Sequence, residues 1–119
     1  MAVEGGVEGW RMGLDLLSHR TTIVAIKDMA WEQIADQTLG KSRWVTKLVP
    51  LDRGVLPWSE VFYCLNQAGF NGWFSVHSEY QGSHSWRDLT LPDLLAQTRQ
   101  DLEYLRWASG AGVAKLTQQ

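Results

Sequence analysis

His77 and Glu79 are the residues of this chain whose types and spacing best suit metal binding. They lie two positions apart, at the polar end of an apolar run at 73–80 that is typical of a strand. Because side chains alternate along a strand, both point to the same side. An imidazole and a carboxylate are competent ligands for Zn²⁺ or Mn²⁺. The alternative is a pair of hydrogen-bonded polar groups that hold no metal.

Lys27 and Asp28 close a second apolar run, residues 21–27, and form the next candidate pair. An ammonium at this position suits a phosphate or sugar hydroxyls, and the neighbouring carboxylate suits the orientation of a ligand. An ion pair, or a helix cap at the start of a loop, accounts for the same two residues.

Seven tryptophans are spread along the 119 residues. Most of them are expected to pack beneath loops and between helices and strands. Trp31 and Trp44 differ because both fall in the segment 29–56, which contains Gly40, Pro50 and Gly54 and is predicted to be a long loop. Flat apolar rings stack on the C–H faces of sugars, so these two residues are the candidates for substrate binding.

The elements that must position these residues follow from hydrophobic periodicity. A helix is predicted over 7–18, and the β-branched run at 21–27 is typical of a strand buried on both faces. A second helix starts at Pro57 and Trp58 and ends at Gly69. After the strand at 73–80, Thr90 and Pro92 open a third helix, and residues 109–119 are expected to form a flexible tail.

This order predicts an α/β fold with about two parallel strands and three flanking helices, because a crossover helix joins parallel strands. Two parallel strands leave both of their outer edges unpaired, so something must complete the sheet.

Composition restricts the function classes. The formal charge of −2 offers no broad basic field, so nucleic acid is not an expected partner. No apolar run is long enough to span a membrane, and the N-terminus has no signal-peptide pattern. The single Cys64 cannot form an internal disulfide, which fits a cytoplasmic location.

Two segments resemble the last two βα units of the xylose isomerase-like barrels, the sugar phosphate isomerase/epimerase superfamily. One is Ile23-Val24-Ala25-Ile26-Lys27-Asp28-Met29-Ala30-Trp31; the other runs from Pro50-Leu51-Asp52-Arg53-Gly54-Val55 to Gly69-Phe70-Asn71-Gly72-Trp73-Phe74-Ser75-Val76-His77-Ser78-Glu79-Tyr80. The resemblance implies the C-terminal part of a (β/α)8 TIM barrel over residues 1–108. Such barrels place their active site at the C-terminal ends of the strands.

The resemblance also implies a function. An intact barrel of this family would isomerise or epimerise a sugar or sugar derivative with a divalent metal such as Mn, Mg, Co or Zn. His77 and Glu79 would then lie at the metal, Lys27 and Asp28 at the substrate or beside the metal ligands, and Trp31 near the sugar. The chain alone is expected to be inactive, since most of the family's ligands lie on the first six strands.

The chain departs from the family pattern at several positions. Ala25 occupies the place of a His ligand on the seventh strand, and His77 occupies the place of a carboxylate on the eighth. Asp52 and Arg53 replace the Gly and acidic positions of the turn. Two other hypotheses therefore stay open: a non-catalytic module that completes its sheet with itself or with a complementary chain, and a relict that does not fold stably.

Overall fold

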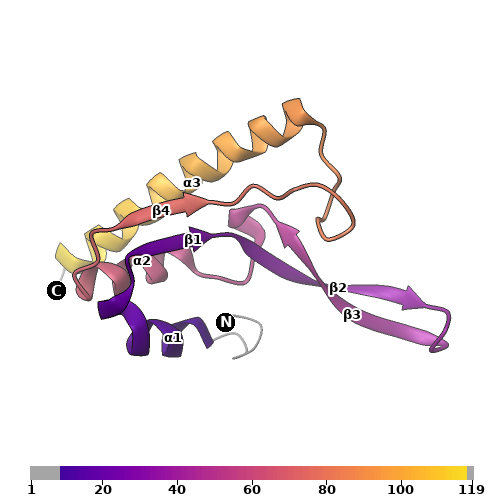
Figure 1. The fold of residues 1–119 in the computed structure, drawn as a ribbon, viewed down its shortest axis with the longest axis horizontal. Coiled ribbons are helices and arrows are strands. Elements are labelled where there is room, and N and C mark those ends of the chain that lie inside the picture. Colours follow the sequence, from indigo (N-terminus) through magenta and orange to yellow (C-terminus); the bar gives the residue numbers. More distant parts are fainter. Residues whose placement is uncertain (1–8, 118–119) are drawn as a thin grey trace.

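A computed structural model describes the backbone of residues 9–117 and the side chains of residues 9–110. The chain folds into a mixture of helices and strands, shown in Figure 1. In order, the elements are α1 (Gly9–Leu17), η1 (Ser18–Arg20), β1 (Ile23–Ile26), β2 (Asp28–Asp36), β3 (Lys41–Val49), η2 (Leu51–Arg53), α2 (Trp58–Gln67), β4 (Trp73–Val76) and α3 (Leu91–Thr117). None of the helices in this part of the chain is long and apolar enough to cross a membrane.

β1 and β4 form the predicted parallel pair. Their register runs from Ile23 opposite Trp73 to Ile26 opposite Val76. Helix α2 makes the crossover between them and ends where the sequence predicted, because Gly69 takes a positive φ of 78° just beyond it. The α/β class, the parallel sheet and the three α-helices are thus confirmed.

The prediction of a long loop at 29–56 is wrong. Most of that segment is an antiparallel hairpin in which β2 pairs with β3, from Asp28 opposite Val49 to Asp36 opposite Lys41. Gly40, with a φ of 65°, supplies the left-handed residue of the turn. The hairpin projects away from the helices (Figure 1). Both of its faces carry a mixture of polar and apolar side chains, so the alternation that marks a strand with one buried face is absent.

The hydrophobic core lies between one face of the parallel sheet and the helices. Ile26 of β1 is fully buried against residues of α2 and α3. The remaining buried members of this core are Trp10, Leu51, Trp58, Val61, Phe62, Leu65, Leu105 and Ala108. The three helices therefore pack around a single sheet face.

The opposite face of the parallel sheet is bare. Ile23 and Ala25 of β1 and Trp73 and Ser75 of β4 are exposed, and Trp73 keeps 80% of its surface accessible. The prediction that the first strand is buried on both faces is wrong for the chain as it stands. Among residues 9–117, β1 and β4 each have only the other as a strand neighbour.

Helix α3 extends beyond the predicted domain boundary. The sequence indicated a flexible tail over 109–119, whereas the backbone is helical to Thr117. The flexibility of that tail stays a prediction.

Candidate ligand site at the strand ends

Lys27 and His77 lie side by side because they follow the ends of two adjacent parallel strands. The backbone N–H of His77 donates to the carbonyl of Ile26 at 2.9 Å, so the ladder continues one residue past β4. Glu79 joins the two side chains. Its Oε2 lies 3.5 Å from Lys27 Nζ, and its Oε1 lies 3.5 Å from His77 Nδ1.

We call Lys27, His77 and Glu79 the strand-end cluster. Its three side chains are each between 38% and 47% exposed, so all of them are open to a ligand from solvent. The cluster combines a cation, an imidazole and a carboxylate. Such a set can donate hydrogen bonds to hydroxyl or phosphate oxygens and accept them from hydroxyl groups.

The pair His77 and Glu79 fits two positions of a metal centre. Two atoms bound to one tetrahedral Zn²⁺ at about 2.1 Å each lie about 3.4 Å apart, close to the 3.5 Å between His77 Nδ1 and Glu79 Oε1. A zinc centre has at least three protein ligands. Among the side chains that the structure describes, no group of three His, Cys, Asp or Glu residues is placed to hold a metal ion. These residues therefore fit part of a metal site, and further ligands would have to come from outside them.

Asp28, predicted to act beside Lys27, lies outside the cluster. Its carboxylate is buried and accepts four N–H hydrogen bonds. Oδ1 accepts from the backbone of Met29 at 2.7 Å and of Val55 at 3.1 Å, and Oδ2 accepts from the backbone of Leu56 and the indole of Trp58, both at 3.1 Å. Burial raises the pKa of this carboxyl, and the four donors oppose that rise. Asp28 thus joins the start of β2 to the segment that leads into α2.

Trp31 and Trp44 share one face of the hairpin. Trp31 pairs with Thr46 and Trp44 pairs with Gln33, which makes the two tryptophans diagonal neighbours on that face. Their side chains are 52% and 62% exposed. The strand advances about 3.3 Å per residue, so Trp31 lies about 13 Å from Lys27 along β2, and Gln33 lies about 20 Å away. The fold brings the tryptophans together but sets Trp44 well apart from the strand-end cluster.

Several residues that support the cluster had no distinguishing signal in the sequence. Tyr80 donates from its hydroxyl to Asp101, a carboxylate buried on α3 that also accepts the backbone N–H of Leu51. A ring nitrogen of His84 lies 3.1 Å from the carbonyl of Glu79. These contacts hold the segment after β4 against α3 and η2. These contacts could not be predicted because the partners of each pair lie 5 to 50 residues apart in the sequence.

No protein-family model matches this chain, and neither a curated protein nor a solved structure is similar enough to count as a match. The function is therefore argued from the geometry of the strand ends and from the sequence motifs.

Proposed function

We propose that this chain carries the final two βα units of a site that binds a sugar or sugar derivative, as in the xylose isomerase-like barrels that its motifs resemble. The observation that supports this proposal is the convergence of Lys27, His77 and Glu79 at the carboxyl ends of adjacent parallel strands. Ligands of parallel α/β folds bind at that end of the strands. The whole reaction, an isomerisation or epimerisation, needs the further strands of a barrel, so the 119-residue chain is expected to be inactive by itself.

Each member of the cluster has a distinct part in this proposal. The Lys27 ammonium binds a phosphate or hydroxyl oxygen of the substrate. His77 and Glu79 would hold a divalent metal together with ligands from outside the described residues, and the ion pair with Lys27 would keep the Glu79 carboxylate in place. When bound, the metal would polarise the carbonyl group of the sugar. Asp28 has no part in this step, since its four hydrogen bonds are made within the chain.

In this proposal Trp31, the nearer of the two tryptophans along the hairpin, stacks on a sugar that is held at the cluster. Trp44 lies too far along the hairpin to touch the same monosaccharide. It contributes only to an extended ligand, such as an oligosaccharide that runs along the hairpin face.

Mn²⁺ binding tests the proposal directly. Titration of the chain with Mn²⁺, followed by electron paramagnetic resonance of the free ion, is expected to show one weak site. The double variant His77→Ala/Glu79→Ala should lower its affinity at least about tenfold. The control His19→Ala/Glu32→Ala removes the same two residue types from exposed positions elsewhere and should bind as the unaltered chain does. Equal binding by all three proteins removes the metal assignment.

A second candidate function is a non-catalytic module that completes its sheet by association. The bare face of the parallel sheet and the two unpaired strand edges favour it. Light scattering at micromolar concentration distinguishes the possibilities, since a monomer that unfolds cooperatively contradicts this second function and leaves the first in place.

A further inference from the structure

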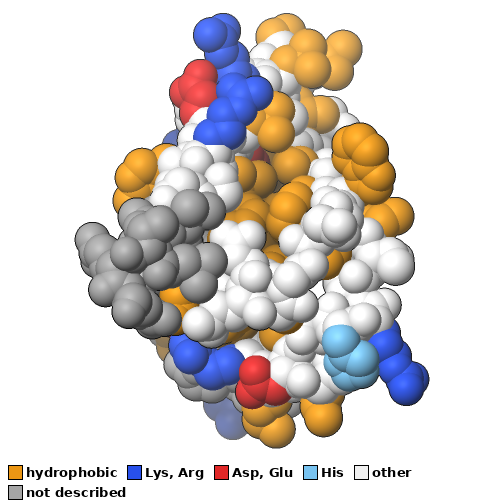
Figure 2. Space-filling view, turned by 90° about the vertical axis from the view of Figure 1, so that its left-hand side faces the viewer, with side chains coloured by type: hydrophobic (Ala, Val, Ile, Leu, Met, Phe, Trp, Pro, Cys, Tyr) orange, Lys and Arg blue, Asp and Glu red, His pale blue; other side chains and the backbone are white. Residues whose placement is uncertain are grey.

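An apolar cavity with a volume of about 630 Å³ opens between β4, α2 and α3. Three of the side chains that line it, Ile26, Phe62 and Leu105, belong to the buried core. Figure 2 shows apolar side chains within a hollow at this end of the molecule. Pockets that hold small molecules have volumes of about 300–1,000 Å³ and mostly apolar walls with a few polar groups. The cavity therefore has the size and the lining of a ligand site.

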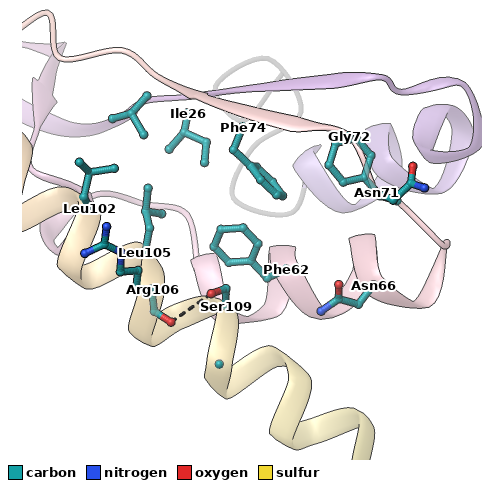
Figure 3. Close-up of a pocket in the computed structure, with 13 residues that line it drawn as sticks. Ile26, Phe62, Asn66, Asn71, Gly72, Phe74, Leu102, Leu105, Arg106 and Ser109 are labelled. Atoms are coloured by element: carbon teal, nitrogen blue, oxygen red, sulfur yellow. Dashed lines mark hydrogen bonds between the residues drawn. The ribbon is translucent and has the colours of Figure 1, made fainter.

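Three phenylalanines form one wall of the cavity. The ring of Phe74 on β4 makes edge contacts with Phe62 of α2 and with Phe70, at centroid distances of 5.1 Å and 5.2 Å. Figure 3 shows Phe62 and Phe74 pointing toward one another. Phe74 still keeps 41% of its surface accessible. An apolar ligand beside it would remove that surface from water, which is favourable.

Arg106 is the only charged residue among the described residues that line the cavity. It shares one face of α3 with Leu102, Leu105 and Ser109, because helical positions three and four apart are neighbours. Within residues 9–110, its guanidinium makes no ion pair and no hydrogen bond, although its backbone carbonyl accepts from the Ser109 hydroxyl at 3.0 Å. In this part of the chain, a cation with five N–H donors thus borders an apolar space without an acidic partner.

The two ends of the cavity differ in charge. Figure 3 shows Leu102 and Arg106 at one end and Asn66 and Asn71 at the other, with Phe62 between them. Side-chain amides are uncharged, so the positive charge lies at one end of an apolar space. A guanidinium binds a carboxylate through two parallel N–H···O hydrogen bonds. The complementary ligand has one carboxylate and an apolar body.

We propose that this cavity binds a small apolar carboxylate, such as a fatty acid of medium chain length. Its carboxylate pairs with Arg106, and its chain lies against Phe62 and Phe74. The single positive charge of the guanidinium is balanced by the single negative charge of the ligand. A neutral apolar ligand fits less well, because it would shield the guanidinium from water without giving it a partner.

This site is separate from the strand-end cluster. Phe74 and Val76 of β4 line the cavity. Because side chains alternate along a strand, His77 points to the other side. The inference is therefore independent of the proposed sugar site.

Calorimetric titration of the chain with decanoate tests the proposal. One decanoate is expected to bind per chain. Decylammonium has the same alkyl length and a positive head group, so it should bind at least about tenfold more weakly. Octanoate is two CH₂ groups shorter and should also bind at least about tenfold more weakly, because each buried CH₂ contributes about fourfold in affinity.

Reversal of the charge at Arg106 tests the role of the guanidinium. Arg106→Glu should bind decylammonium more tightly than decanoate. Arg99→Glu is the matched control, because it makes the same change of net charge on an α3 side chain that is 84% exposed and lies outside the cavity. It should keep the preference for decanoate. Ser109→Phe fills the cavity and should lower the affinity for decanoate at least about tenfold.

Three results overturn the proposal: no uptake of decanoate by the unaltered chain, uptake of several molecules per chain, and a preference for decanoate that survives Arg106→Glu. Circular dichroism of each variant establishes that loss of binding is not loss of fold. None of these variants changes Lys27, His77 or Glu79, so each should bind Mn²⁺ as the unaltered chain does. Failure of decanoate binding together with intact Mn²⁺ binding therefore rejects this inference alone.

Discussion

The carboxylate of Asp28 lies directly against the Cα of Gly54, so closely that a Cβ added there would lie 2.0 Å from Asp28 Cγ. No side chain fits between them. The contact is tight because the segment after η2 wraps around Asp28 and donates the backbone N–H groups of Val55 and Leu56 to it. The absence of a side chain at residue 54 therefore maintains the connection between the hairpin and α2.

Gly54→Ala is expected to lower the free energy of unfolding by about 1–3 kcal/mol, the range for a side chain forced into a filled site. Gly110→Ala is the matched control, because nothing lies within 4 Å of a Cβ there and the residue is helical. It should stabilise the chain by about 0.5–1 kcal/mol. Urea unfolding followed by far-ultraviolet circular dichroism measures both. Equal effects of the two changes would contradict the contact with Asp28.

Asp28→Asn is expected to destabilise the fold by about 2 kcal/mol. Each carboxylate oxygen of Asp28 accepts two N–H groups. Because the amide NH₂ of Asn replaces one of these oxygens, two N–H groups lose their acceptor. Mn²⁺ affinity at the strand-end cluster should stay the same, since Asp28 lies outside it. If affinity falls while stability is unchanged, Asp28 belongs to the ligand site after all.

Alkaline pH should unfold the chain through Tyr80. Burial raises the pKa of its hydroxyl above the ordinary value of 10, and the hydrogen bond that it donates to Asp101 adds to this rise. Above pH 10 the unfolded chain releases a proton that the native state keeps. The contribution of Tyr80 to the free energy of unfolding therefore has its full value below pH 10 and decreases as the pH rises beyond it.

Thermal unfolding between pH 8 and pH 11 measures this dependence. Tyr80→Phe removes the ionisable group, so its stability should fall less steeply above pH 10 than that of the unaltered chain. Burial also raises the pKa of Tyr104, which leaves a smaller slope in the variant. Identical slopes for the two proteins would show that Tyr80 ionises freely in the folded state.

The two hairpin tryptophans should respond differently to the length of a carbohydrate ligand. Trp31→Ala is expected to weaken binding of both a monosaccharide and an oligosaccharide. Trp44→Ala should weaken only the oligosaccharide, because Trp44 lies too far from the strand-end cluster. Calorimetric titration with the two ligands measures this. Both residues are more than half exposed, so neither change should alter the unfolding midpoint by more than a small amount.

The helices and the parallel strands could be predicted because their signals are local. The 3.6-residue period and Gly69 define α2, and the β-branched run marks β1. The joint position of Lys27, His77 and Glu79 could also be predicted, since parallel strands bring their carboxyl ends to one edge.

The hairpin was hidden for a physical reason. β2 and β3 form a projecting two-stranded sheet with no fully buried face, so neither shows the alternation expected of a half-buried strand. The structural role of Asp28 could not be predicted either, because three of its four hydrogen-bond donors lie 27 to 30 residues away in the chain. A sequence shows that a carboxylate follows a strand, but only tertiary structure shows what surrounds it.

The distance along the chain between β1 and β4 sets the order in which this protein can fold. β2 and β3 are joined by a short turn and can pair within microseconds. Ile23 of β1 cannot pair with Trp73 of β4 until the hairpin and α2, which separate them in the chain, have been synthesised. Pairing over such a separation is slow. During synthesis on the ribosome, β1 must therefore leave the exit tunnel as an unpaired apolar segment. It stays so until β4 emerges, which makes this interval the time when the nascent chain is most exposed to aggregation.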